Sequence, residues 1–270
     1  MDIQLTEQPV AAPSIRRSRS WLPAVAAALI VICLVPPLSA AARRYLFVES
    51  VQFCVFALAA PALVVLGAPW RLLRLARVAD RLAAARRRRT SFATTLPALI
   101  AWVAICLSWR LPPVLDALAR HPALVAPEAV TLCAAGTALW LELVPSPPLA
   151  PRVAQPQRAC LAALAMWSIW VIAYVLGFAS GAVVHAYDHG GSHLSTVSDQ
   201  EITAFVLWAA AGAAFIPVIF AAVMGWLKDG AEPTEESAAG PLNTGVRGWG
   251  TRPARSRRRP SARGTSRPSA

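Results

Sequence analysis

The chain alternates between long apolar runs and short segments that are polar or rich in proline. The six apolar runs cover residues 21–42, 47–66, 92–109, 123–144, 159–184 and 202–227. An uncharged apolar stretch of roughly 18 residues or more is typical of a helix that crosses a bilayer. These runs are rich in Ala, Leu and Val without period-two alternation, which favours helices over the strands of a membrane barrel. The pattern predicts an all-α membrane protein, a bundle of six transmembrane helices.

The segment 70–90, between the second and third runs, is amphipathic instead. Helical spacing places basic residues on one face and apolar residues on another: Arg71, Arg74, Arg77 and Arg81 against Leu72, Leu75, Val78 and Leu82. A basic amphipathic helix binds membrane surfaces through its apolar face and through the anionic headgroups. We therefore expect this segment to lie on the membrane and to contact anionic lipids.

The two ends of the chain differ from the membrane domain, which we place at 21–227. Residues 1–20 are polar and end in a basic cluster, while residues 228–270 combine Gly, Pro, Ser and Arg without apolar periodicity. The latter composition predicts a disordered, Arg-rich tail. The first apolar run also has the features of a cleaved signal sequence, including the small residues at 38–42. Its length favours an uncleaved first span.

The basic residues are distributed unevenly between alternate loops. One side collects the N-terminal cluster, the eight arginines of segment 70–90, Arg152, Arg158 and the tail, whereas the other side has only four arginines, at 43, 44, 110 and 120. By the positive-inside rule, both termini then face the cytoplasm. We expect a multi-pass protein of the cell membrane, of bacterial plasma membrane type.

Composition excludes an ordinary soluble domain, because 56% of the residues are hydrophobic and only 15% are charged. The net charge of +12 comes from the chain ends and one loop rather than from one face of a folded domain. This distribution indicates how the protein is oriented in the membrane and where it contacts the bilayer. We therefore expect no nucleic-acid partner.

Side chains that bind soft metals gather on the predicted outer side. The candidate metal ligands are His185, His189, His193, His121, Glu49 and Cys54. The spacing of His185 and His189 puts both imidazoles on one side of a helical turn, and Gly190 and Gly191 let the chain fold back to present His193. Imidazole, thiolate and carboxylate together suit copper or zinc. The alternatives are a solvated loop that binds nothing and cysteines that serve as packing residues.

Several pieces of the chain between residues 45 and 227 resemble a known family. They are Val51-Gln52 followed by APALVVLGAPWRLLR, then WRLPPVLDALARHPALVAPEAVTLCAAGTALW, and finally Ser198-Asp199-Gln200. In this order they resemble the CtaG-type assembly factors of cytochrome c oxidase. The resemblance implies a cytochrome c oxidase subunit as partner and copper delivery to it at the outer face of the membrane. The residues that match the family pattern are His121, Glu128, Asp199 and Gln200.

The chain departs from that family pattern where metal ligands are expected. Members of the family have His on both sides of the Val-Gln pair, where this chain has Glu49 and Phe53. Near the start of the fourth span, Val125 and Ala129 stand where further His are expected. A phenyl ring cannot coordinate a metal, and a carboxylate is a poorer ligand for Cu(I) than imidazole. Two explanations are possible. Either His185, His189 and His193 bind the metal instead, or the chain keeps the fold of the family without binding a metal.

Three functions follow from these patterns. The first is a non-enzymatic assembly factor that positions copper for a haem-copper oxidase. The second is a metal-free scaffold that stabilises an oxidase subunit by helix packing, helped by small residues at 136, 177, 181 and 212. The third is a small transporter, for which the ionisable residues Glu128 and Glu142 lie too near the ends of their spans. The sequence contains no CxxCH haem-attachment motif and no recognisable Ser, His and acid set, so we do not expect an enzyme.

Overall fold

The computed structural model describes residues 19–71, 76–87, 91–179, 181, 183–187 and 194–231. Throughout these residues the regular structure is helical. The α-helices are α1 (Leu22–Leu34), α2 (Leu38–Ala42), α3 (Leu46–Cys54), α4 (Ala60–Gly67), α5 (Ala76–Arg87), α6 (Leu96–Trp109), α7 (Pro112–Arg120), α8 (Val125–Leu143), α9 (Gln155–Gly177) and α10 (Thr196–Ala231). A π-helix, η2 (Val55–Ala59), joins α3 to α4, and η6 (His185–Tyr187) is a short 3₁₀ turn. Most of the predicted N-terminal segment 1–20 and of the tail 228–270 lies outside the described residues.

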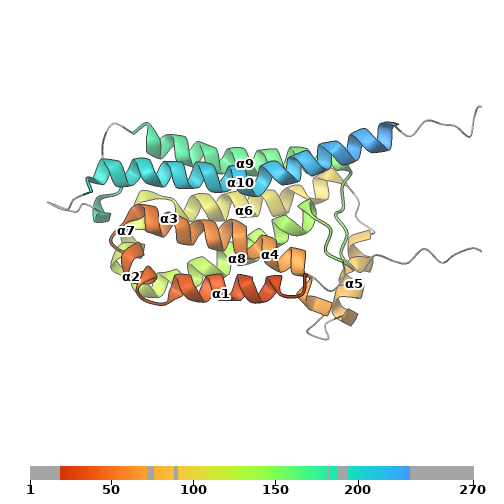
Figure 1. Cartoon of the computed structure of the whole chain (residues 1–270), viewed down its shortest axis with the longest axis horizontal. Helices are drawn as coiled ribbons and strands as arrows, with labels where there is room; N and C mark the ends of the chain where they lie inside the picture. Colours follow the sequence, from red (N-terminus) through yellow and green to blue (C-terminus); the bar gives the residue numbers. More distant parts are fainter. Residues whose placement is uncertain are drawn as a thin grey trace, which may run out of the picture. The chain divides into compact units, whose positions relative to one another are not determined.

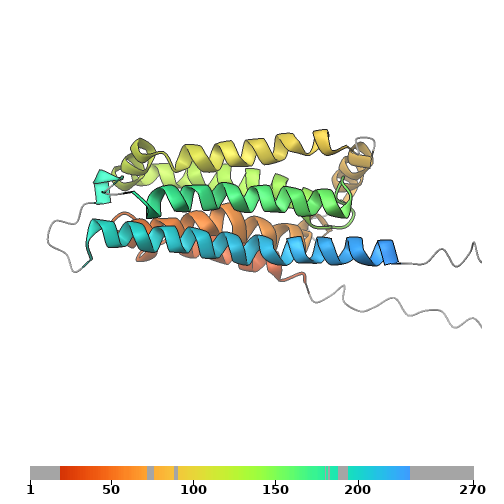
Figure 2. The ribbon, with the colours of Figure 1, turned by 90° about the horizontal axis from the view of Figure 1, so that it is seen from above.

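The long helices run side by side in one bundle (Figure 1). Helices α9 and α10 pair along most of their length, α10 also packs on α3, α1 packs on α4, and α8 contacts both α4 and α6. Helix α5 lies at one end of the bundle and α7 at the other in both views (Figure 2), so we call these the α5 end and the α7 end.

The helical elements confirm a polytopic membrane bundle. Five of them are long and apolar enough to cross a bilayer: Leu46–Gly67, Phe92–Trp109, Pro122–Leu143, Gln155–Gly177 and Thr196–Gly230. The shorter apolar helix Leu22–Leu34 accompanies them. Its 13 residues rise about 20 Å, less than the roughly 30 Å of a hydrocarbon core.

Proline accounts for the main differences between the predicted spans and the helices. The first span was expected to run through 21–42, but α1 ends at Leu34 and α2 begins at Leu38, because Pro36 and Pro37 interrupt the backbone hydrogen bonds between them. The Pro-rich connection after Arg110 forms α7, with Pro112 and Pro113 in its first turn, where a missing N–H costs nothing. One further difference does not involve proline: the fifth span was expected to reach residue 184, but α9 ends at Gly177.

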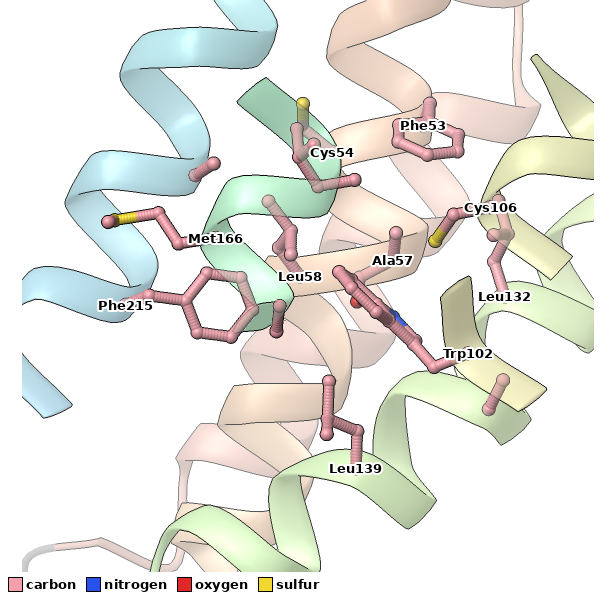
Figure 3. Packing of buried hydrophobic residues seen from close by; sticks show 14 of the residues in the cluster. Phe53, Cys54, Ala57, Leu58, Trp102, Cys106, Leu132, Leu139, Met166 and Phe215 are labelled. Carbon is pink, nitrogen blue, oxygen red and sulfur yellow. The ribbon is translucent and has the colours of Figure 1, made fainter. Parts of the chain in front are cut away.

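A π-helical segment shapes the centre of the bundle. Pro61 has no N–H, so it cannot donate a helical hydrogen bond to the carbonyl of Ala57. The indole of Trp102 on α6 lies beside Ala57 (Figure 3) and donates to that carbonyl at 3.3 Å. Helix α8 approaches closely because Gly136 has no side chain: a Cβ there would lie 2.6 Å from Pro61 Cγ and 2.8 Å from the Ala57 oxygen. Gly136 therefore permits close helix packing within the bundle itself.

Helix α5 covers most of the described part of the predicted surface helix 70–90. It buries Ala79 and Ala83 and leaves Val78 and Leu82 exposed. Arg86 fastens it to α8, since Nη2 lies 3.0 Å from Glu142 Oε1 and donates to the Leu141 carbonyl at 3.0 Å. Burial lowers the pKa of Arg86, and the charge of Glu142 opposes that shift.

Glu142 is shared with a second arginine. Arg152, from the loop before α9, donates to both Glu142 oxygens at 3.0 Å and 2.6 Å. Both guanidinium groups lie beside the last turn of α8, where the helix dipole is negative. The basic loop and α8 are thereby joined at the α5 end.

Candidate functional site at the α7 end

A buried ion pair links α3 to α6. Arg110 follows the last residue of α6, and its Nη1 lies 2.7 Å from Glu49 Oε2 while Nη2 lies 3.2 Å from Oε1. Nη1 also donates to Ser50 Oγ at 2.9 Å. Glu49 stands in the first turn of α3, where the helix dipole favours a negative charge. The two-pronged geometry matches the planar guanidinium to both carboxylate oxygens, so the pair is both strong and directional.

Phe53 completes the enclosure of the guanidinium. It lies one helical turn after Glu49, and the centre of its ring is 3.9 Å from Arg110 Cζ, which is the geometry of a cation–π contact. The side chains of Arg110 and Glu49 are only 2% and 5% exposed. Removing either partner would leave a buried charge without compensation, which is costly in a low-dielectric interior.

Two further polar groups surround this ion pair. Glu128, from the first turn of α8, interacts with Glu49 and Arg110. Tyr187 of η6 is buried near the same groups; burial raises the pKa of its hydroxyl, and the negative charge of Glu49 raises it further. Among the described residues, Glu128 Oε1, the Tyr187 hydroxyl and Arg110 Nε have no hydrogen-bond partner. The α7 end therefore holds a compact polar cluster, made of Glu49, Ser50, Arg110, Glu128 and Tyr187.

Asp199 and Gln200 hold the helix ends around this polar cluster. The Asp199 carboxylate accepts from the backbone N–H groups of Leu46 and Phe47 at 2.8 Å each, which caps the start of α3. Gln200 donates to the Leu176 carbonyl at 2.7 Å and accepts from Val183 N–H at 2.9 Å. Asp199 and Gln200 thus join α10 to the start of α3 and to the end of α9.

The described part of the His-containing loop is also fixed at the α7 end. Ala186 N–H donates to Asp116 Oδ1 of α7 at 2.8 Å. Tyr187 is buried in an apolar cluster with Leu46, Leu115 and Leu118. His189 and His193 lie outside the described residues, and only the backbone of His185 is described.

The other predicted ligands do not converge. His121 is exposed at the end of α7, and both carboxylate oxygens of Glu49 are engaged by Arg110. Cys54 and Cys106 are buried, but their sulfur atoms do not point toward one another (Figure 3). Among the described residues, no three His, Cys, Asp or Glu side chains could hold a metal ion together. Within these residues the predicted ligands are therefore not brought together at one site.

The sequence placed Glu49 among the outer-side candidates and Glu128 near the end of its span, but it did not predict Arg110, Ser50 and Tyr187 as their neighbours. The sequence does contain one indication that these two residues are paired: Arg110 directly follows an apolar run, and Glu49 lies inside another. An ionisable residue at membrane depth usually has a partner. The identity of that partner depends on how α3, α6 and α8 pack, which the helical pattern alone does not specify.

The fold and the enclosed polar cluster define an integral membrane protein of the helical, multi-pass class. Residues 3–229 match the model of the cytochrome c oxidase caa3 assembly factor family. The chain belongs to this family, which confirms the resemblance seen in the sequence. No curated protein matches the chain, and no solved structure does.

Proposed function

We propose that this chain assists cytochrome c oxidase assembly as a non-catalytic membrane scaffold that contacts an oxidase subunit and needs no metal of its own. One observation carries this proposal. Glu49 and Phe53, at the positions where the family pattern has His, enclose the guanidinium of Arg110. A cation supplied by the chain itself then balances the carboxylate. This arrangement supports a rigid α7 end rather than an exchangeable ligand set.

The α7 end would face outward, where the copper centre of the oxidase is assembled according to the family resemblance. The α5 end would face the cytoplasm of a bacterial-type plasma membrane. The charge distribution supports this orientation, because the basic helix α5 lies at the α5 end (Figure 1), and Arg152 contacts the same Glu142 as Arg86 of α5. In the described part of the chain, the start of α1 and the end of α10 lie at this same end (Figure 1).

The scaffold function is tested by complementing a strain that lacks this chain and measuring assembled oxidase by its haem spectrum and activity. We expect the unmodified chain to restore the oxidase. A variant with His185→Ala, His189→Ala and His193→Ala should restore it equally well. Arg110→Met, with Glu49 left unpaired, should restore much less. Loss of the oxidase in the triple His variant at normal protein level would contradict a metal-free scaffold.

Copper delivery is the second candidate, and one observation favours it. Asp116 and Tyr187 fix the turn 185–187 at the α7 end. His185 belongs to this anchored turn, and His189 and His193 follow it in the sequence. If this loop carries the ligands, the triple His variant should lose oxidase activity while keeping its level in the membrane. Added copper should restore part of that activity. The two candidates thus predict opposite results for the same variant.

A further inference from the structure

An open apolar groove runs along the bundle between α3, η2 and α4 on one side and α10 on the other. Its volume is about 940 Å³. The small residues on its walls include Ala59 and Ala62 on one side and Ala210, Ala213 and Ala214 on the other. Small residues are frequent on both walls, which leaves the groove open where larger side chains would close it.

Among the described residues that line the groove, two are charged, Arg19 and Arg158. Arg158 lies in the first turns of α9, and Arg19 precedes α1. Both α1 and α9 begin at the α5 end of the bundle (Figure 1). The rest of the lining is apolar apart from the indole N–H of Trp140, which has no hydrogen-bond partner among the described residues.

Arg158 is held in place by neutral groups. Its Nε and Nη2 donate to the Leu143 carbonyl at 2.8 Å and 2.6 Å, and Nη1 donates to Gln155 Oε1 at 2.9 Å. Arg86, Arg110 and Arg152 each pair with a glutamate, whereas Arg158 forms no ion pair within the described residues. The groove therefore has a fixed positive charge at one end that no carboxylate of the described chain balances.

An apolar groove with arginines at one end is complementary to an amphiphile with a hydrocarbon tail and an anionic head. We propose that the groove binds an anionic phospholipid of the membrane, with its phosphate at Arg19 and Arg158 and one acyl chain along the walls of α4 and α10. A transmembrane helix of a partner would fill the apolar walls, but an apolar helix would leave the charge of Arg158 unbalanced. The lipid satisfies both features.

Native mass spectrometry of the full-length protein in detergent tests this site, with phosphatidylglycerol and phosphatidylcholine of identical acyl chains as probes. We expect phosphatidylglycerol to bind more tightly. The double variant Arg19→Gln, Arg158→Gln should bind it roughly 25-fold more weakly, since each arginine near an anionic headgroup contributes a factor of roughly five. The matched control Arg44→Gln, Arg120→Gln removes two positive charges from exposed positions outside the groove and should keep the affinity.

Two more variants distinguish the contributions to lipid binding. One tests the charge of Arg158 apart from its hydrogen bonds, and the other tests the acyl-chain contacts apart from the headgroup contacts. Arg158→Lys keeps the positive charge but loses the two-pronged contact with Leu143, and it should keep the preference for phosphatidylglycerol. Ala213→Trp fills the groove and should weaken both lipids. Midpoints of thermal unfolding in detergent show whether each variant is folded.

Three results would overturn the proposal. The first is equal affinity for the two lipids, and the second is a loss of affinity in the Arg44→Gln, Arg120→Gln control as large as that in the groove variant. The third concerns a different occupant: an oxidase subunit whose co-purification is lost with Ala213→Trp but unchanged with Arg19→Gln, Arg158→Gln would assign the groove to a helix. None of these results depends on whether the chain carries copper.

Discussion

At the residue scale, the α7 end is organised by one guanidinium. Arg110 pairs with both oxygens of Glu49 and lies against the ring of Phe53. A buried ion pair of this kind contributes little net free energy compared with an apolar replacement, but breaking it is costly. Its role is therefore to fix the relative position of α3 and α6.

Removal of Arg110 should be more harmful than removal of the whole pair. We expect Arg110→Met to lower the free energy of unfolding by about 3–5 kcal/mol, because Glu49 stays buried without its partner. The double variant Glu49→Gln, Arg110→Met should recover a large part of that loss. Denaturant titration in detergent micelles, analysed as a double-mutant cycle, measures this coupling. Additive effects of the two substitutions would show that the pair is not coupled.

At the element scale, the spans follow from apolar run length, but their interruptions depend on particular residues. The third span was placed at 92–109, and the candidate membrane span is Phe92–Trp109. The break at Pro36 and Pro37, the helix α7 and the π-helical turn before Pro61 were not predicted. Apolar periodicity does not distinguish a proline that ends a helix from one that a neighbouring side chain accommodates. In the second span that neighbour is Trp102, on another helix.

The close approach of α8 to η2 predicts a specific intolerance at Gly136. Gly136→Ala should destabilise the bundle by about 1–3 kcal/mol, since the added methyl group would lie 2.6 Å from Pro61 Cγ and 2.8 Å from the Ala57 oxygen. Gly212→Ala is the matched control, because the nearest atom to its added Cβ is Ile216 Cδ1 at 3.6 Å. Thermal unfolding in detergent compares the two. Equal effects would mean that α8 does not pack this closely.

The attachment of α5 should depend on Glu142. Glu142→Gln weakens the contacts with Arg86 and Arg152, so α5 should detach more often from α8. Limited trypsin digestion of inside-out vesicles should then cut after Arg77 and Arg81 several-fold faster. Asp80→Asn, a charge change at an exposed position of α5, should leave the rate unchanged. An unchanged rate in Glu142→Gln would show that the apolar contacts of Ala79 and Ala83 suffice.

At the scale of the whole molecule, the arrangement gives a bundle with two different ends. The α7 end encloses the polar cluster, and the α5 end carries α5, Arg152 and Arg158. The sequence predicted the class of fold and the separation of charge between the ends. It did not predict the pairing within the polar cluster, because the partners come from α3, α6, α8 and η6, far apart along the chain.

The orientation of the two ends is open to direct measurement. In a chain whose five cysteines are replaced by alanine, we expect His121→Cys at the α7 end to react with an impermeant maleimide on intact cells. Arg81→Cys on α5 should react only after the membrane is permeabilised. The opposite pattern would place the α5 end outside and contradict the charge rule.

The metal-free scaffold is tested most directly by the copper content of the full-length protein, purified in detergent and loaded with Cu(I) under reducing conditions. The ion pair at Glu49 and the scattered positions of His121, Cys54 and Cys106 lead us to expect no bound copper after removal of the excess. The opposite result would be about one equivalent of copper per chain that is lost in the variant His185→Ala, His189→Ala, His193→Ala. It would contradict the metal-free scaffold and assign copper binding to these histidines.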